Sequence, residues 1–311
     1  MLSIAFTSIG QELEEDHEPK AQISVGSYHM CILNDSKVTC QLMRESGIYV
    51  FNNEVPALVN PTKISSSGNL ACTIDDTGVV CWRTMDGPNY ATRGLDRLIS
   101  LTPQNLINPT DISLSEAYSC VIDDSRVVCW GEGGYIQNIP KLINPSKISV
   151  GKDMACALDD TGVVCWSKTY SGGPKVYRDN HPNLSNPSFI NISRAGACAI
   201  DDSGVVCWDP QNETWRVNKL AAMMKKTPDL SNPEYVAANG DSICVLDEEN
   251  VKCWSDIGSS DTVPSLENPS HIFLVKDRHC ALDDKGVTCW RNLYNDITTP
   301  FKSTLTKRNK G

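Results

Sequence analysis

The chain of 311 residues lacks the signatures of several large protein classes. No apolar run reaches the roughly 18 residues that a membrane-spanning helix needs, so no membrane insertion is expected. Basic residues are outnumbered, 28 Lys and Arg against 38 Asp and Glu, and the net charge of −10 argues against a nucleic-acid partner. A Gly-rich phosphate loop, an HExxH motif and a nucleophile elbow are also absent. We therefore predict neither enzymatic activity nor a cofactor.

Histidine is scarce, with five in the chain, whereas cysteine is abundant, with 14. Structural zinc sites use closely spaced Cys and His ligands, and CxxC spacing is missing here, so no metal is predicted. The cysteines instead favour disulfides, which form and persist in oxidising compartments. The expected location is secreted, periplasmic or at the cell surface.

The cysteines form seven pairs, each with eight residues between its members, and first cysteines recur every 36 to 48 residues. Such a period is typical of propeller blades. A valine lies seven residues after every first cysteine, and a tryptophan follows the second cysteine in six repeats, with Gln41 as the exception. Six repeats also carry Asn-Pro twelve residues before the first cysteine. The pairs are Cys31 with Cys40, Cys72 with Cys81, Cys120 with Cys129, Cys156 with Cys165, Cys198 with Cys207, Cys244 with Cys253 and Cys280 with Cys289.

Each cysteine pair brackets a predicted β-hairpin, as the second repeat illustrates. Asp75 to Gly78 has the composition of a turn, because Asp favours turn starts and Gly tolerates the left-handed conformation. A hairpin closed there sets Ile74 opposite Val79 and Cys72 opposite Cys81. Opposed residues in an antiparallel pair have Cα atoms about 4.5–5.5 Å apart, within reach of a disulfide. We predict one disulfide inside each hairpin.

The acidic pairs in these turns have two other interpretations, a calcium site or acid–base catalysis. Because a pair recurs in most repeats, each belongs to its own turn, and we interpret the carboxylates as turn residues. The pairs are Asp75 and Asp76, Asp123 and Asp124, Asp159 and Asp160, Asp201 and Asp202, and Asp283 and Asp284.

The hairpin strands are apolar on both faces, which indicates sheets that are covered on both sides. Stacked propeller blades provide this environment. The predicted fold is all-β, a seven-bladed β-propeller over residues 19–302, with the tryptophans in the core between blades. Residues 1–18 are a lead-in, either a trimmed signal remnant or a disordered segment, and residues 303–311 a disordered tail. The segment 295–302 resembles a final strand, which either completes its own blade or joins the next one.

Two motifs carry a family resemblance. The tract Gly26 to Leu33 is similar to the Gly-x-x-His signature of the regulator of chromosome condensation repeat family, and Leu158 to Trp166 is similar to its turn-plus-strand ending. The resemblance covers residues 19–302 and implies a seven-bladed propeller. Only His29 keeps the signature histidine. The paired cysteines resemble the family's secreted bacterial branch, which includes propellers that inhibit β-lactamases by clamping them with one face of loops.

Chain topology assigns the connections of a four-stranded blade, a to d, to two faces. The b–c turns and d–a links form one face, called here the link face, and repeat almost unchanged. The a–b loops and c–d segments form the other, the loop face, and the c–d segments vary from 13 to 25 residues. Variable loops on a rigid scaffold are where recognition usually lies. The predicted binding residues are Tyr28, His29, Asn69, Glu116, Tyr118, Asp153, Met154, Arg194, Trp215, Asp241, Arg278 and His279.

These observations predict a secreted, monomeric, protein-binding propeller that acts as an inhibitor, adhesin or recognition module. Its partner is expected to be another protein or a cell-surface glycan. The alternatives are an extracellular glycan-binding or glycan-cleaving propeller and a guanine-nucleotide exchange factor, which the paired cysteines disfavour. Trp215 is expected in a long, exposed c–d loop.

Overall fold

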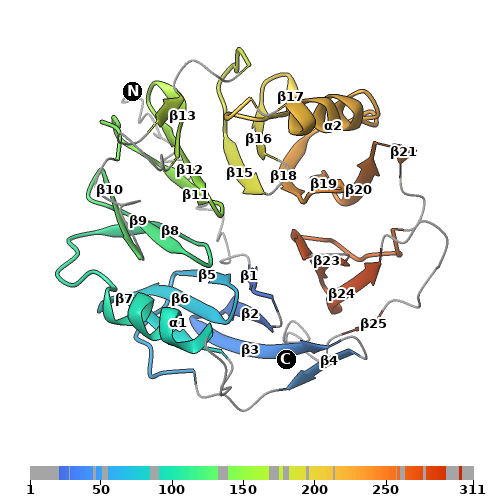
Figure 1. The fold of residues 1–311 in the computed structure, drawn as a ribbon. Helices are drawn as coiled ribbons and strands as arrows, with labels where there is room; N and C mark the ends of the chain where they lie inside the picture. Colours follow the sequence, from blue (N-terminus) through green and yellow to red (C-terminus); the bar gives the residue numbers. More distant parts are fainter. Residues whose placement is uncertain are drawn as a thin grey trace, which may run out of the picture.

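The computed structural model of the protein is a ring of seven antiparallel sheets around a central axis (Figure 1). It describes residues 21–27, 29–44, 47–50, 55–84, 91–131, 139–167, 175–177, 182–193, 196–212, 214–256, 258–259, 263–275, 278–291 and 301–302. The predicted lead-in, the predicted tail and the binding residues Tyr28 and Arg194 lie outside the described residues. The predicted seven-bladed β-propeller is confirmed.

Every blade has three core strands, and four blades have a fourth strand among the described residues. Blade 1 has β1 (Gln22–Val25), β2 (His29–Asn34), β3 (Lys37–Arg44) and β4 (Gly47–Val50); blade 2 has β5 (Lys63–Ser67), β6 (Leu70–Asp75) and β7 (Gly78–Arg83); blade 3 has β8 (Pro109–Leu114), β9 (Tyr118–Asp123) and β10 (Arg126–Gly131). Blade 4 has β11 (Lys147–Val150), β12 (Met154–Asp159), β13 (Gly162–Ser167) and β14 (Lys175–Tyr177); blade 5 has β15 (Phe189–Ser193), β16 (Gly196–Asp201) and β17 (Gly204–Trp208). Blade 6 has β18 (Pro233–Ala238), β19 (Ile243–Asp247), β20 (Asn250–Ser255) and β21 (Gly258–Ser259); blade 7 has β22 (His271–Val275), β23 (Arg278–Asp283), β24 (Gly286–Arg291) and β25 (Phe301–Lys302).

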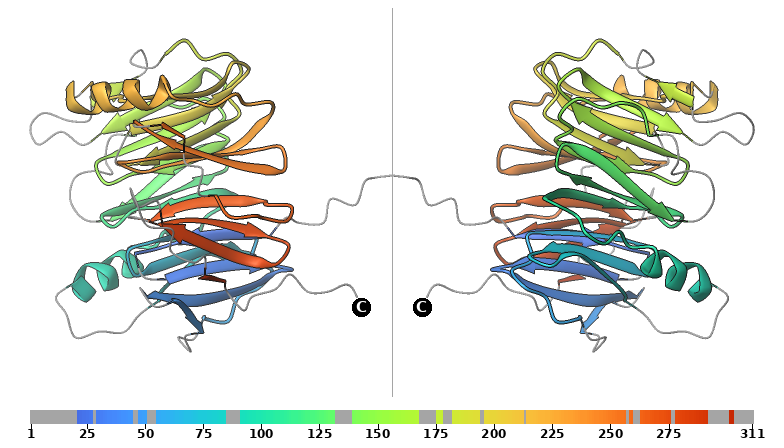
Figure 2. Two further views of the ribbon diagram at one scale, coloured as in Figure 1. Left: turned by 90° about the vertical axis from the view of Figure 1, so that its right-hand side faces the viewer. Right: turned by 90° about the vertical axis from the view of Figure 1, so that its left-hand side faces the viewer.

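Two helices lie in the segments after the third strand of a blade: α1 (Ala91–Ser100) follows β7 of blade 2, and α2 (Thr214–Met224) follows β17 of blade 5. Both of these blades have three described strands. The two helices project from the same side of the disc (Figure 2). Leu98 of α1 packs into the core between blades 2 and 3, and Leu220 and Met223 of α2 into the core between blades 5 and 6. Within the described part of the chain, neither helix is long and apolar enough to cross a membrane.

The b–c hairpins have the predicted register. In blade 2, Ile74 pairs with Val79 and Cys72 with Cys81, and one further pair, Asp75 with Gly78, leaves only two residues in the turn. The two cysteines of each hairpin lie directly opposite each other in all seven blades.

All seven predicted disulfides are confirmed, each inside its own hairpin, with Cα atoms 4.0 to 4.1 Å apart. This separation is somewhat shorter than the range expected from the sequence. Each bridge joins two core strands of a single blade, and none joins two blades. In blade order the bridges connect Cys31 to Cys40, Cys72 to Cys81, Cys120 to Cys129, Cys156 to Cys165, Cys198 to Cys207, Cys244 to Cys253 and Cys280 to Cys289.

The acidic turn residues fasten each turn to the link that leads into its own blade. In blade 2 the Asp75 carboxylate accepts hydrogen bonds from the backbone amides of Val59, at 2.9 Å, and Thr77, at 2.8 Å. The Asp76 carboxylate accepts one from the side-chain amide of Asn60, at 2.6 Å. Burial would raise the pKa of Asp75, but these bonds and the Thr77 hydroxyl outweigh it and hold the pKa below its usual range. The turn interpretation of these pairs is consistent with this geometry, which recurs at Asp159 and Asp160 and at Asp201 and Asp202.

The apolar core is divided among the interfaces between blades. Seven clusters each join one hairpin to the next blade. In six of them a buried tryptophan packs against the preceding blade; Trp130 of blade 3, for example, shares a cluster with Ile74 and Val79 of blade 2. The six are Trp82, Trp130, Trp166, Trp208, Trp254 and Trp290. Each sheet is thus covered on both faces by its two neighbouring blades, and at six of the seven contacts a tryptophan supplies a large part of the buried apolar surface.

Blade 7 meets blade 1 through a cluster of different composition. Leu282 and Val287 pack against Met30 and Ile32, and the position of the interface tryptophan is taken by Gln41, which is buried. β25 pairs with β24 of its own blade, and every described strand pairs within its own repeat. Among the described residues, the first and last repeats therefore share no strand, and blades 7 and 1 contact each other through side-chain packing.

Serines on the inner strands (strand a of each blade) form hydrogen bonds that link the first five blades. An inner strand exposes one row of unpaired backbone amides, which need acceptors. The Ser113 hydroxyl of blade 3 accepts a hydrogen bond from the Val150 amide of blade 4, at 3.0 Å. Equivalent bonds run from Ser66 to Ser24, from Leu114 to Ser65 and from Ile192 to Ser149, at 2.7 to 3.1 Å. In blades 5 to 7 the neighbouring inner strands instead make ring contacts, Phe189 with Tyr235 at 4.6 Å and Tyr235 with His271 at 5.7 Å.

Ser113→Ala should lower the free energy of unfolding by about 1–3 kcal/mol, because the Val150 amide loses its acceptor between two blades. Denaturant unfolding with the disulfides intact measures the loss. Thr110→Ala, at an exposed position of the same strand, is the matched control and should change stability by no more than about 0.5 kcal/mol. Equal losses in the two variants would mean that the bond between blades contributes nothing.

Candidate functional site: the loop face

The a–b turns of the loop face are shorter than the sequence suggests. Four of them close with a hydrogen bond from a backbone amide to the carbonyl three residues later: Gly26 to His29, Ser115 to Tyr118, Gly151 to Met154 and Asn239 to Ser242, at 2.7 to 3.0 Å. Only the two residues between these partners form the tip of each turn. Strand b begins directly afterwards.

This geometry corrects the placement of four predicted binding residues. His29, Tyr118, Met154 and His279 were expected in a–b loops, but they lie in the first two positions of a b strand, and each is no more than 4% exposed. A side chain at that point of a two-sided blade is directed into the contact between blades. Met154 also lines a surface hollow.

The structure supplies a physical reason for the Gly-x-x-His signature. A Cβ atom on Gly26 would lie 2.2 Å from Cε1 of His29 and 2.5 Å from the Gly68 carbonyl oxygen, so only glycine fits. The His29 ring fills this space, and its Nδ1 lies 2.9 Å from the Thr84 hydroxyl of blade 2. In this chain the signature histidine joins two blades and is not offered to a partner.

The remaining described binding residues lie at or near the surface of the loop face. Glu116, Asp153, Asp241 and Trp215 are exposed, and Asn69 is half-buried. Asp241 is paired with Lys219 of α2, with Nζ and Oδ1 2.6 Å apart. Arg278 opens β23, where the structure describes its backbone. The binding role of these residues stays a prediction.

Trp215 lies in the first turn of α2 and not in an irregular loop as expected. Its side chain is 56% exposed, which is unusual for so large an apolar residue. The Arg216 guanidinium lies 5.1 Å from the centre of the Trp215 ring. Arg216 is itself held by the Gln211 side-chain oxygen at 2.9 Å and lies 3.7 Å from the Asp209 carboxylate. These contacts anchor the residue next to Trp215 to the end of blade 5.

A hollow of about 490 Å³ and another of about 430 Å³ adjoin each other on this face. The smaller one, which we call the Trp215 pocket, is lined by Asp153 and Met154 of blade 4 and by Gln211, Trp215 and Arg216 of blade 5. Three of the predicted binding residues, from two blades, thus meet in one pocket. Sequence reasoning missed Gln211 and Arg216, because their role follows from a helix that the repeat pattern does not contain.

The larger hollow is the mouth of the central channel. Its wall combines apolar side chains such as Phe273 with polar ones such as Ser67 and Asn191, and Glu116 contributes a carboxylate. Ile192 and Ser193 line both hollows, so the channel mouth and the Trp215 pocket are direct neighbours on the loop face. Concave sites that combine apolar surface with a few polar groups are the usual form of binding sites, and both hollows have linings of mixed polarity.

A third hollow, of about 560 Å³, opens on the link face between blades 5 and 6. Of its three aspartates, Asp201 and Asp202 already accept hydrogen bonds from Ser185 and Asn186 of the link; the third is Asp229. These contacts belong to the structural pattern that is repeated around the ring. This hollow is therefore a weaker candidate than the two hollows on the loop face.

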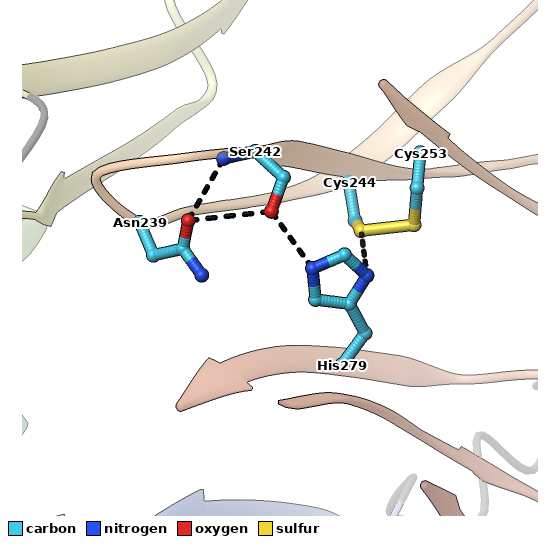
Figure 3. The surroundings of a disulfide bond; sticks show 5 residues. All are labelled: Asn239, Ser242, Cys244, Cys253 and His279. Carbon is cyan, nitrogen blue, oxygen red and sulfur yellow. Dashed lines mark hydrogen bonds between the residues drawn. A yellow bond between two sulfur atoms is a disulfide. The ribbon is translucent and has the colours of Figure 1, made fainter. Parts of the chain in front are cut away.

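A serine–histidine pair between blades 6 and 7 resembles a catalytic dyad in its distances (Figure 3). The Ser242 hydroxyl oxygen lies 2.7 Å from Nε2 of His279, and Asn239 Oδ1 lies 3.2 Å from the same oxygen. Nδ1 of His279 faces the Cys244 sulfur at 3.7 Å, where a hydrolytic triad would have a carboxylate. Ser242 and His279 are each 1% exposed, so a substrate cannot reach the pair. The pair packs blade 7 against blade 6.

Comparison with known proteins gives a fold but no family. No family model matches the chain, and no curated protein matches it. Among solved structures, the CRINKLY WD40 ectodomain of the Arabidopsis thaliana receptor kinase ACR4 matches with a TM-score of 0.56 and 15% identity, over 87% of this chain and 94% of that one. Hsv2 of Kluyvelomyces marxianus matches with a TM-score of 0.58 and 6% identity, over 90% and 97%. At these identities the likeness concerns the fold alone.

Prp20p of Saccharomyces cerevisiae also matches, with a TM-score of 0.47 and 12% identity over 90% of this chain and 76% of that one. None of these matches tests the secreted bacterial branch of the repeat family.

Burial lowers the pKa of His29 and of His279 from 6.5 to about 4, although for His29 the Gly68 carbonyl partly opposes the effect. Between these two pH values the unfolded chain binds more protons than the folded one, so stability is complete above pH 6.5 and declines toward pH 4. Protonation of each histidine lowers the free energy of unfolding by about 3 kcal/mol at the acid end of this pH range.

His29→Gln should therefore flatten the pH dependence of the unfolding free energy between pH 6.5 and 4, because glutamine keeps a polar contact to Thr84 without titrating. Denaturant unfolding at several pH values, compared with the unmodified protein, provides the measurement. An unchanged slope would show that His29 takes up its proton as easily in the folded protein as in the unfolded chain.

Proposed function

We propose that the chain is an exported recognition propeller that binds a protein partner on its loop face, centred on the Trp215 pocket and the adjoining channel mouth. The observation that carries the proposal is the convergence of Asp153, Met154 and Trp215 on one pocket. An exposed tryptophan beside an arginine has the composition of an interface anchor. The surrounding blades hold these groups on a rigid frame, which lowers the entropic cost of binding.

Export is supported by the cysteines. All 14 are paired in disulfides within their own blades, and cytosolic reductants keep thiols free. The similar propeller of the Arabidopsis receptor kinase is described as an ectodomain, which is consistent with this fold serving outside a cell.

A binding role fits the loop face better than catalysis. The Ser242–His279 pair is sealed between two blades, and the two hollows on the loop face contain Glu116 and Asp153 on different blades. General acid–base chemistry needs groups that converge on one reacting bond. We therefore propose a binding module without enzymatic activity of its own.

A photo-crosslinking amino acid placed at position 215 tests the proposal. Incubated with the extracellular fraction of its source culture, this variant should give a discrete crosslinked protein. The same substitution at Ile107 is the matched control, since Ile107 is an exposed apolar residue, 70% accessible, on the link face. Mass spectrometry identifies the partner, and Trp215→Ala should weaken its binding at least tenfold, which corresponds to about 1.4 kcal/mol.

Equal crosslinking at positions 215 and 107 would overturn the assignment of the face. Retention on immobilised glycans that is lost in Trp215→Ala, without a protein crosslink, would favour the alternative of a glycan-binding propeller.

A further inference from the structure

The mouth of the central channel, a hollow of about 490 Å³, takes its charge from one side chain. Among the described residues that line it, Glu116 alone carries a charged group. Tyr235 also lines the hollow, and burial, with a smaller contribution from the Asp111 carboxylate, raises the pKa of Tyr235 to about 12. The phenol therefore stays neutral at physiological pH. A hollow lined by charge of one sign concentrates ligands of the opposite sign, here cations.

The Glu116 side chain extends over three blades at the rim of this hollow. It starts from the a–b turn of blade 3 and reaches blade 1, where its Oε1 accepts a hydrogen bond from the Ser27 hydroxyl at 3.4 Å. On the way it passes Gly68 of blade 2, since a Cβ atom on Gly68 would lie 3.4 Å from Cγ of Glu116. The Ser27 amide donates to the Gly68 carbonyl at 2.8 Å, which joins the turns of blades 1 and 2. The carboxylate is therefore held in place by its neighbours.

An apolar wall lies on blades 7 and 1, next to the residue that holds Glu116. Val25 and Phe273 line the hollow and pack against the same core cluster between these two blades. Leu274 lines the hollow beside Phe273. Val25 comes two residues before Ser27, so the wall adjoins the hydrogen-bond partner of Glu116. The channel mouth thus combines an apolar wall, which includes an aromatic ring, with one carboxylate at its rim.

A second carboxylate near the channel, that of Asp111, is compensated within the protein. It lies outside the lining of the channel mouth, and its Oδ2 accepts a hydrogen bond from the Ile148 amide at 2.9 Å. Burial raises the pKa of Asp111, and this bond and the positive charges of Lys147 and Lys63, on the neighbouring blades, oppose the effect. Glu116 is therefore the carboxylate that a ligand in the channel mouth would meet.

The composition of the hollow selects among cations. An arginine binds a carboxylate best through both of its oxygens, and Oε1 of Glu116 already accepts a hydrogen bond from Ser27. An ammonium group is a point charge that needs only one oxygen. A lysine also covers apolar surface with its methylene stem while its charged end stays near water.

We propose that the channel mouth is a subsite for a lysine side chain, which lies with its stem along Phe273 and Leu274 and its ammonium group at Glu116. That the lysine belongs to a protein partner rests on the proposed function. The subsite itself can be tested without any partner.

N-acetyl-lysine methylamide is a suitable probe, because its side chain carries the only charge. The full chain, with its disulfides intact, is titrated with this probe, and saturation-transfer NMR measures the weak binding expected of so small a ligand. The norleucine analogue, which has an apolar stem without the ammonium group, and the arginine analogue are the comparison probes. We expect saturable binding of the lysine probe, at least tenfold tighter than that of either analogue.

Glu116→Gln removes the charge and keeps both the size of the side chain and an oxygen for Ser27. It should weaken binding of the lysine probe at least tenfold and leave binding of the norleucine analogue unchanged. Asp153→Asn is the matched control, since it removes another exposed carboxylate of the loop face and changes the net charge by the same amount. It should leave binding of the lysine probe unchanged.

Three results would overturn the proposal: no saturable binding of the lysine probe, equal affinity for the lysine and norleucine probes, or equal losses in Glu116→Gln and Asp153→Asn. Trp215→Ala should bind the lysine probe as the unmodified protein does, because Trp215 lines the neighbouring pocket and not the channel mouth. A failure of the subsite can therefore be told apart from a failure of the Trp215 pocket to bind a partner.

Discussion

The whole structure depends on one constraint: a blade whose inner strands are apolar on both faces cannot exist alone. Each hairpin needs a neighbour on either side, and the neighbours are supplied by the same repeat, six times with a tryptophan. The disulfides act at a different level. They fix the register of each hairpin and limit the freedom of the unfolded chain, but they join no blade to another. Cohesion of the ring therefore rests on packing and on hydrogen bonds between blades, among them those of the serine hydroxyls on the inner strands.

Much of this architecture could be predicted from the sequence, because it is repeated. The pairing of Cys72 with Cys81 followed from the length of the tract between them and the composition of the turn. The burial of Trp130 and its counterparts followed from their place on hairpin strands that are apolar on both faces. The closing of the ring was left open, because a final strand beyond residue 295 fits either arrangement, and only its pairing with β24 decides between them.

The candidate site was harder to predict because it is the part of the molecule that does not repeat. His29 and Tyr118 were expected at the surface, since the start of a strand cannot be located to within two residues from composition. The two-residue turns put both beneath the surface. Trp215 was expected to be exposed, and it is, but the helix that carries it and the pairing of Arg216 with Gln211 have no counterpart in the repeat pattern. The link face, which repeats from blade to blade, could therefore be predicted from the sequence, whereas the loop face, which varies, could be predicted only in part.

The contact between blades 7 and 1 gives the molecule a mechanical weak point. In propellers whose last blade borrows a strand from the first repeat, a pull on the two ends loads a row of hydrogen bonds in shear. Here the described ends of the chain lie in two blades whose described contact is a cluster of side chains such as Leu282 and Met30, with Gln41 where the other contacts have an indole ring. Tension along the chain would therefore part this contact first and open the ring into an arc. The seven hairpins, each locked by its own bridge, would remain folded along that arc.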